Sequence, residues 1–106
     1  MNRNFISDIN HFLDENGAIP STLTPEGKDV AEGLSKIIAC VTQGPRKSPK
    51  TDVRCWSELN REMCAGEIDA GIDLQKFTIL WNCEKCGDSG SISNWENTFW
   101  DHGYRP

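Results

Sequence analysis

The chain has 106 residues, 37% of them hydrophobic, and a formal net charge of -5. This length allows one domain, or a helical segment with a very small second module, but not two full hydrophobic cores. No segment approaches the roughly 18 consecutive apolar residues of a membrane span, which argues against a membrane protein. The start of the chain lacks the pattern of a signal peptide, so we expect a cytoplasmic protein whose cysteines are reduced.

Charge is unevenly distributed along the chain. The formal charge is -3 over residues 1–45, +3 over residues 46–54 and -5 over residues 55–106. Nucleic-acid-binding proteins normally present a basic face, because phosphate contacts dominate their affinity. Here only the short middle segment is basic, which favours a protein over a nucleic acid as partner.

Residues 2–17 predict an amphipathic helix. Apolar residues recur with the spacing of one helical face, at Phe5, Ile6, Ile9, Phe12 and Leu13. Asn2 or Asn4 is a suitable N-cap, and Gly17 stands where a helix end favours a left-handed residue. The apolar stripe is more typical of a core face than of a partner-binding face.

A second helix is predicted between Thr24 and Gly44-Pro45. Thr24 is a good N-cap and Pro25 suits the first helical position. The apolar stripe of this helix consists of Val30, Leu34, Ile37, Ile38 and Val41. The two predicted helices either pack on each other as a hairpin or both lie against a sheet. Cys40 adjoins the stripe and is interpreted as a packing residue.

Residues 46–54 contain prolines and lack apolar periodicity, which predicts an exposed basic linker. The chain would then divide into a helical region over 1–45, this linker, and a β region over 55–106. The helices and the β region either share one core or form separate ones. Any contact with nucleic acid would use the basic residues Arg46, Lys47, Lys50 and Arg54.

Beyond the linker the hydrophobic period changes from that of a helix to that of a strand. Apolar and polar residues alternate over residues 67–75 and again over residues 76–83. The short joint at Gln75-Lys76 indicates an antiparallel hairpin. A third strand is predicted near residues 90–95, and three strands are about the minimum for independent stability.

Cys83 and Cys86 are separated by two residues and followed by Gly87. This spacing lets a tight turn point both sulfurs at one metal ion, and it provides half of a tetrahedral site. Cys55 and Cys64 are the candidates for the other half, giving the pattern C-x8-C-x18-C-x2-C. We therefore predict a closed metal site formed by these four cysteines, holding zinc or, alternatively, iron.

Two other interpretations of the cysteines stay open. A redox pair at Cys83 and Cys86 is one, although such pairs usually begin a helix, and these follow a predicted strand. Packing without any metal is the other. His102 could replace one thiolate, but a lone histidine near the end of a chain is more often simply exposed.

The aromatic residues near the end of the chain allow two interpretations. Trp81 alternates onto the same strand face as Ile79, so core packing is its expected role. Trp95, Phe99 and Trp100 would either cover the metal site or present an aromatic surface to a partner. Of these two roles, covering the site is the one we predict.

The run WNCEKCGDSGSISNWENTFWD, preceded by VRCWSELNREMCAGEI, resembles an uncharacterised group of short prokaryotic proteins. In that group an Arg-Cys segment, a Cys-x-Gly-x-Ile strand start and a W-x-C-x-x-C-G-D-x-G-x-I-x-x-W ending occur together. The resemblance covers residues 53–101, and the group is itself similar to zinc ribbons. It implies that Cys55, Cys64, Cys83 and Cys86 form one site. Zinc ribbons usually carry a second C-x2-C where this chain has C-x8-C.

These patterns predict an α+β protein with an N-terminal helical pair and a three-stranded, antiparallel, zinc-ribbon-like sheet. The predicted function is that of a non-enzymatic, metal-stabilised module that binds another protein. Two alternatives are a nucleic-acid-associated adaptor and a thiol oxidoreductase that uses Cys83 and Cys86. The pathway, the partner and the oligomeric state are left open by the sequence.

Overall fold

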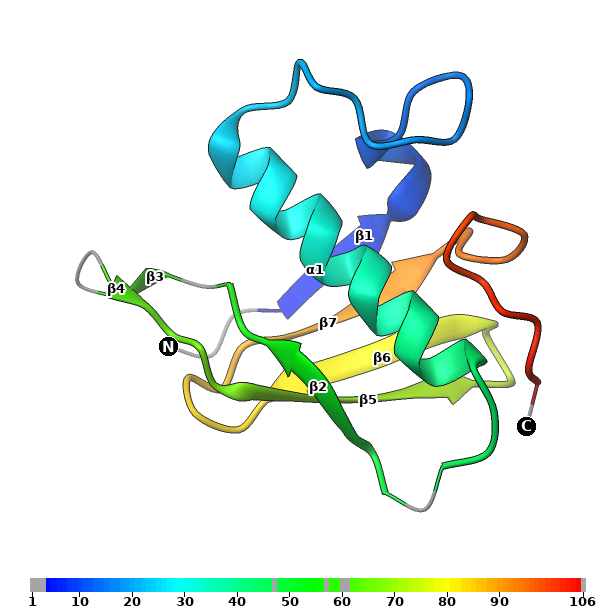
Figure 1. Ribbon diagram of the computed structural model, residues 1–106. Helices are drawn as coiled ribbons and strands as arrows, with labels where there is room; N and C mark the ends of the chain where they lie inside the picture. The colour runs from blue at the N-terminus through cyan, green and yellow to red at the C-terminus, as the bar shows by residue number, and fades with distance from the viewer. Residues whose placement is uncertain (1–3, 47, 57, 60–61, 106) are drawn as a thin grey trace.

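The computed structural model describes residues 4–46, 48–56, 58–59 and 62–105. Figure 1 shows a long helix lying across a β-sheet. The elements in chain order are β1 (Asn4–Asp8), the 3-10 helix η1 (Ile9–Phe12), α1 (Pro25–Thr42), β2 (Lys50–Arg54), β3 (Glu58–Leu59), β4 (Glu62–Met63), β5 (Glu67–Asp73), β6 (Thr78–Cys83) and β7 (Ser89–Ser93).

Five strands form one mixed sheet in the order β1-β7-β6-β5-β2. The pairs β2·β5, β5·β6 and β6·β7 are antiparallel, whereas β1 runs parallel to β7. The strands β3 and β4 form a separate small hairpin between β2 and β5. The prediction of three antiparallel strands is therefore wrong, because the sheet also contains β1, from the predicted helical region, and β2, from the predicted linker.

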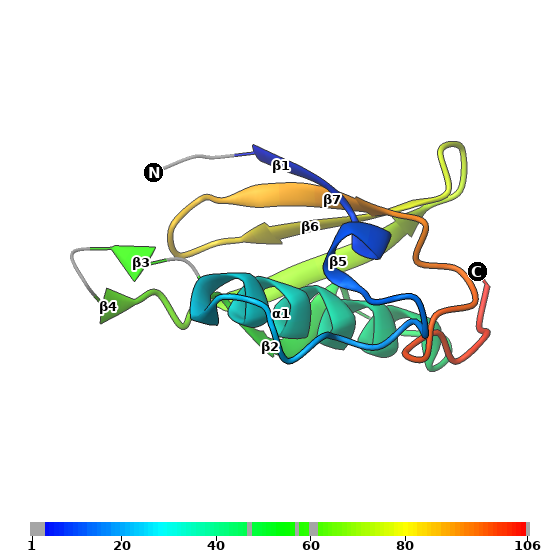
Figure 2. The ribbon, with the colours of Figure 1, turned by 90° about the horizontal axis from the view of Figure 1, so that it is seen from above.

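Helix α1 forms as the sequence predicts. The Thr24 side chain caps it by accepting a hydrogen bond from the Gly27 N–H, and Pro25 occupies the first turn. Figure 2 shows the helix lying along one face of the sheet. Its apolar stripe and the inner sheet face share one core, which includes Leu34, Ile37, Ile38, Ile68, Ile79 and Ile92. Helix and sheet thus depend on each other for burial of apolar surface.

Residues 4–17 do not form the predicted first helix, so the N-terminal helical pair is also wrong. Residues 4–8 form strand β1, and η1 follows directly. The Asp8 side chain accepts a hydrogen bond from the Asn10 N–H, a local turn that competes with a continuous α-helix. Ile9 is fully buried and Phe12 packs against the core, whereas Ile6 is 85% exposed. The apolar residues therefore point in different directions and do not form one helical stripe.

The basic segment also contains regular structure. Residues 50–54 form β2, in which Thr51 and Val53 are buried and their neighbours are exposed. Thr51 donates a hydrogen bond from its Oγ1 to the carbonyl of Ile68 on β5. This strand carries the chain directly to Cys55.

The predicted hairpin of β5 and β6 is confirmed, with Ile68 opposite Cys83 and Ala70 opposite Trp81. Trp81 is buried in the core, as predicted. Since Cys83 ends β6 and Cys64 precedes β5, both lie at the same end of this hairpin.

The described part of the chain contains no helix with the length and hydrophobicity that a membrane span requires.

Candidate metal centre

The turn after β6 forms the first half of a four-cysteine cluster. The N–H of Cys83 donates to the carbonyl of Asp88, and the N–H of Gly87 donates to the carbonyl of Cys83. Gly87 has a φ of 81°, a left-handed conformation that glycine adopts without steric cost. The turn therefore closes tightly and directs Cys83 and Cys86 to the same side.

The second half repeats this backbone arrangement. The N–H of Cys55 donates to the carbonyl of Gly66, and the N–H of Ala65 donates to the carbonyl of Cys55. Ala65, the residue after the second cysteine, is also left-handed, with a φ of 54°. The two half-sites thus share one hydrogen-bond pattern, although one has two residues between its cysteines and the other has eight.

The inserted hairpin explains this difference in spacing. Strands β3 and β4 lie between Cys55 and Cys64, so the chain leaves the half-site along one strand and returns along the other. An antiparallel pair brings its ends together, and the two cysteines consequently meet as they would in a short turn. The spacing C-x8-C is therefore compatible with a compact pair of ligands.

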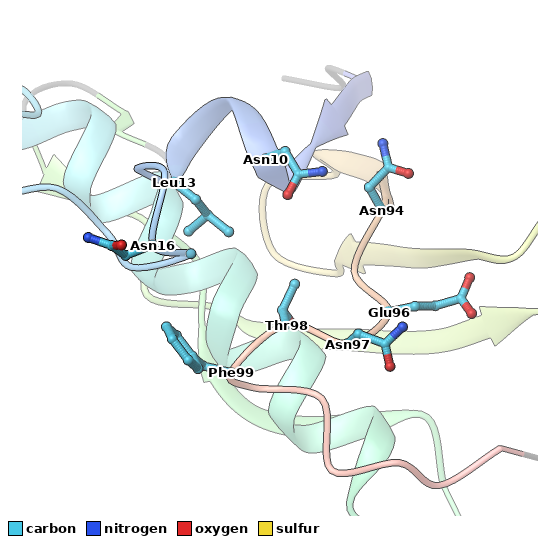
Figure 3. A pocket seen from close by; sticks show the side chains of 9 residues that line it. Asn10, Leu13, Asn16, Asn94, Glu96, Asn97, Thr98 and Phe99 are labelled. Carbon is cyan, nitrogen blue, oxygen red and sulfur yellow. The ribbon is translucent and has the colours of Figure 1, made fainter.

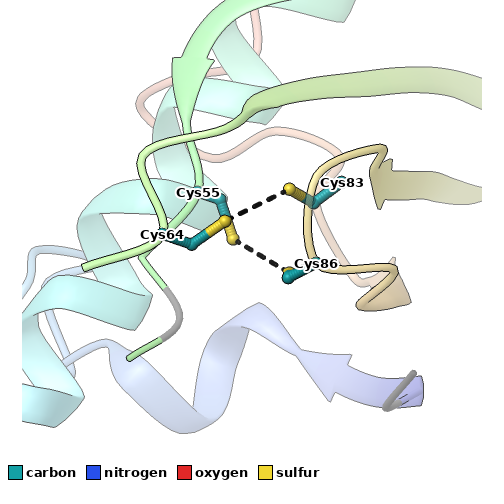
Figure 4. A group of neighbouring side chains, drawn as sticks. All are labelled: Cys55, Cys64, Cys83 and Cys86. Atoms are coloured by element: carbon teal, nitrogen blue, oxygen red, sulfur yellow. Dashed lines mark hydrogen bonds between the residues drawn. The ribbon is translucent and has the colours of Figure 1, made fainter. Parts of the chain in front are cut away.

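The four sulfurs of Cys55, Cys64, Cys83 and Cys86 converge, as Figure 4 shows. All lie within 4.8 Å of one another, with Sγ–Sγ distances of 3.8 Å from Cys55 to Cys86 and 3.7 Å from Cys64 to Cys83. A tetrahedral ion with metal–sulfur bonds of about 2.3 Å requires sulfurs about 3.8 Å apart. The cysteines are not joined as disulfides. The cluster therefore has the size of a tetrahedral metal site.

All four cysteines are buried, the most accessible being Cys86 at 7% exposure. Burial favours the neutral form of a thiol and raises the pKa of Cys83, although N–H groups of Cys86 and Lys85 oppose this effect. For Cys64 burial acts in the same direction, but the Gly66 N–H and the neighbouring thiols outweigh it and lower the pKa. Burial thus dominates the pKa of Cys83, whereas the surrounding hydrogen-bond donors dominate that of Cys64.

Two residues that the sequence analysis did not single out support the cluster. Lys85 donates from Nζ to the carbonyl of Cys64 at 3.0 Å, which links the two half-sites. Gly66 is buried between the two half-sites. A Cβ atom at this position would lie only 2.6 Å from the Lys85 Cβ. The Cys64-x-Gly66 spacing was the available sequence signal for the second half-site turn.

Trp56 follows Cys55 and packs between α1 and the sheet. Its ring centroid lies 5.0 Å from that of Trp81, and a Cβ atom on Gly33 would collide with its ring. The glycine therefore allows the indole to approach the helix closely. Through Trp56 the first cysteine is anchored to α1 as well as to the sheet.

The structure places the other sequence candidates away from the cluster. Among the described residues, the potential metal-binding group contains neither Cys40 nor a histidine. His102 is exposed, and its backbone N–H donates to the Thr42 hydroxyl at the end of α1.

Two basic residues of the middle segment, Arg46 and Lys50, contact other groups of the protein. The Arg46 guanidinium donates to the carbonyls of Pro49, Lys50 and Ala70 at 2.7 to 3.1 Å. Lys50 lies 3.9 Å from both Glu67 and Glu84. Arg54 is exposed, and Lys47 lies outside the described residues. Phosphate contacts at Arg46 and Lys50 would therefore compete with the contacts that these two side chains already make within the protein.

The C-terminal aromatic residues do not cover the cysteines. Trp95 is fully buried, and its Nε1 donates to the carbonyl of Phe77, at the end of the β5–β6 hairpin opposite Cys83. Trp100 packs against the core, and Phe99 is 71% exposed. The interpretation of these residues as cover for the metal site is therefore wrong.

A separate polar pocket of about 330 Å³ lies beside the η1 turn and the segment after β7, shown in Figure 3. Asparagine side chains contribute much of its lining, together with Glu96, Thr98 and Phe99. Asn94 donates from Nδ2 to Asp8 at 2.9 Å, which joins the two walls. None of the five cysteines lines this pocket, so it is distinct from the metal centre.

Comparison of the chain with protein-family models, with curated proteins and with solved structures gives no match.

Proposed function

We propose that Cys55, Cys64, Cys83 and Cys86 hold one zinc ion, and that the protein is a non-enzymatic, metal-stabilised module that binds another protein. The observation that carries this proposal is the convergence of four buried sulfurs, within 4.8 Å of one another, from two half-sites with the same backbone hydrogen bonds. Tetrahedral ligation by four thiolates is typical of structural zinc sites.

The ligand set favours a structural role over a catalytic one. A catalytic zinc site keeps one position open for water or substrate, whereas four cysteines fill the tetrahedron. The potential ligand group contains no carboxylate or imidazole among the described residues. A thiol oxidoreductase is disfavoured, since Cys83 is 1% exposed and its raised pKa reduces the thiolate that would react.

The ion would secure the sheet at the end of the β5–β6 hairpin that carries Cys83. It would join the connection between β2 and β5 to the turn between β6 and β7. Structural zinc sites contribute on the order of 10 kcal/mol or more to folding at neutral pH. A domain of this size has a small core, so a contribution of that order would decide whether it folds.

Exposed apolar residues at the β5–β6 turn support a role in protein binding. Leu74 and Phe77 are 50% and 49% exposed, respectively. The Phe77 carbonyl accepts a hydrogen bond from Trp95, which holds the turn in place. An exposed aromatic residue is a typical anchor in protein interfaces. The acidic net charge and the internal bonds of Arg46 favour a protein partner over a nucleic acid.

The proposal is tested by metal analysis of untagged protein purified without added metal. We expect one zinc per chain and a colourless protein, and removal by a chelator should release four thiols and unfold the sheet. Thiol counts before and after chelation, with circular dichroism, measure both effects. A red-brown protein that contains iron would show that the bound metal is iron and not zinc. A metal-free, folded protein with reactive Cys83 and Cys86 would overturn the proposal.

A further inference from the structure

The two edges of the sheet differ in how well they are protected from pairing with another strand. β2 has an irregular register against β5 between Lys50 and Arg54, and α1 packs against it. Such irregularities protect an edge. β1, at the other edge, pairs with β7 in regular register over all five residues. Among the described residues no strand lies on its outer side.

The backbone of Ile6 points towards this open side. A Cβ atom on Gly90 would lie 2.5 Å from the carbonyl oxygen of Phe5, so that carbonyl is directed at β7. Successive residues of a strand direct their N–H and C=O groups to alternate sides. The N–H and C=O of Ile6 therefore face away from β7, as do those of Asn4, whereas the C=O of Asp8 begins the η1 helix.

We propose that a second copy of this chain binds here, with β1 pairing antiparallel to β1 of the other copy about a two-fold axis at Ile6. In this register Ile6 lies opposite Ile6 of the second copy, and both N–H groups find carbonyl acceptors. The pairing would join two five-stranded sheets into one.

The sequence of β1 is complementary to itself in this register. Asn4 lies opposite Asp8 of the second copy, so that its amide faces a carboxylate that also accepts hydrogen bonds from Asn10 and Asn94 of its own chain. The two Asp8 side chains stand at opposite ends of the paired strands, which avoids a contact between like charges. A shift of two residues would lose the contact between isoleucines and some of these pairs.

Burial of Ile6 provides the apolar contribution. Its side chain is 85% exposed in the single chain, the highest exposure among the exposed large hydrophobic residues described. Ile6 aligns with Ser91 on β7, and Ser91 aligns with Leu80 on β6. All three side chains lie on the sheet face opposite α1, because their strand neighbours Gly90 and Trp81 face the core. The two Ile6 side chains would meet on that face.

The paired edges are short, so the dimer should be weak and depend on concentration. Stable interfaces usually bury more than about 1,000 Å² in total, and a pair of five-residue edges is smaller than the usual interface. Sedimentation equilibrium of the protein as purified, from about 10 μM to about 1 mM, covers the range in which such an interface forms.

The decisive test uses Ile6→Cys in a Cys40→Ala background, with Leu80→Cys as the matched control. Residues opposite each other in a hydrogen-bonded antiparallel pair have Cα atoms about 5.5 Å apart, within the range of a disulfide. We expect mild oxidation to cross-link Ile6→Cys chains into dimers at least about tenfold faster than Leu80→Cys chains. Equal rates would overturn the proposal. The count of protected thiols reports whether the other four cysteines are unchanged.

A second pair of variants tests the same interface without new thiols. Ile6→Lys should abolish self-association, because two cations would meet at the two-fold axis, while Leu80→Lys should preserve it. Ile6→Thr, a milder substitution with high strand propensity, should weaken it and controls for loss of the strand itself. A protein that is monomeric at all concentrations, or that loses association only with Leu80→Lys, would contradict pairing through β1.

Discussion

Gly66 and Cys83 are packed so closely that a Cβ atom on Gly66 would lie 2.8 Å from the Cys83 sulfur. The same atom would lie 2.6 Å from the Lys85 Cβ and 3.4 Å from the Cys64 sulfur. Gly66 therefore stands between the two half-sites, where even a methyl group has no room. The glycine sets the separation of the sulfurs without offering a ligand.

This relationship predicts that Gly66→Ala weakens metal binding. The methyl group would push the turn that carries Cys83 away from Cys64 and distort the tetrahedron. We expect a loss of affinity of about 10- to 100-fold, as for other changes to residues that orient metal ligands. Competition with a colorimetric zinc chelator measures it. Gly71→Ala is the control, since its Cβ would meet nothing within 4 Å. Equal affinities of the two variants would contradict the assigned role of Gly66.

Replacement of a single cysteine should separate metal ligands from packing residues. Cys55→Ser should lose the ion or bind it far more weakly, since a tetrahedral thiolate site then lacks one ligand. The folded state should be lost with it or strongly destabilised. Cys40→Ser, at a half-buried cysteine on α1, should keep one zinc per chain. Metal content and thermal unfolding of both variants check this, and retention of full zinc by Cys55→Ser would be incompatible with the site.

The sequence predicted well the features that depend on local patterns. Helix α1 was recognisable from Thr24, Pro25 and its apolar stripe, and the β5–β6 hairpin from alternation around Gln75-Lys76. The four cysteines were grouped by spacing and residue type, and the structure places them together. The helix N-cap, the hydrophobic period and the type of metal ligand can each be recognised within a short stretch of sequence.

The sequence could not show what depends on distant partners. β1 is a strand because it pairs with β7, about 85 residues away, and its five residues carry no local sign of that partner. In β2 the alternation of Thr51 and Val53 was present but was outweighed by the prolines and positive charge around it. Both β1 and β2 are strands because of their pairing with distant strands, and local sequence propensity cannot show such pairing.

Arg46 and Arg54 should differ in their contribution to stability, although both belong to the basic segment. Arg46→Ala removes a charged donor from three carbonyls and should cost about 1.5–3 kcal/mol. Arg54→Ala, at an exposed position, should change stability by less than about 0.5 kcal/mol. Urea unfolding of the zinc-loaded proteins measures the difference. Equal stability of the two variants would argue that the internal bonds of Arg46 contribute nothing.

Asp101 should make the stability of the C-terminal segment depend on pH. Its carboxylate accepts two hydrogen bonds from Arg105, at 2.9 and 3.1 Å, and its side chain is only 3% exposed. The bonds from Arg105, supported by the N–H groups of Asn97 and Gly103, lower the pKa of Asp101 from 3.8 to about 2. Because the folded state prefers the ionised form, this group stabilises the fold above pH 3.8 and loses its effect as the pH falls through 2.

We therefore expect Asp101→Asn to destabilise the protein by about 2 kcal/mol at pH 7, the free-energy equivalent of this pKa shift. The difference from the unchanged protein should persist to about pH 5 and shrink steadily towards pH 2, as the native carboxylate becomes protonated. Urea unfolding of both proteins gives this difference at each pH at which the zinc stays bound, as metal analysis of the same samples shows. Asp52→Asn, an exposed carboxylate on β2, should show little change at any pH. A difference that is constant or grows on acidification would show that the Asp101–Arg105 pair is not the source of this stability.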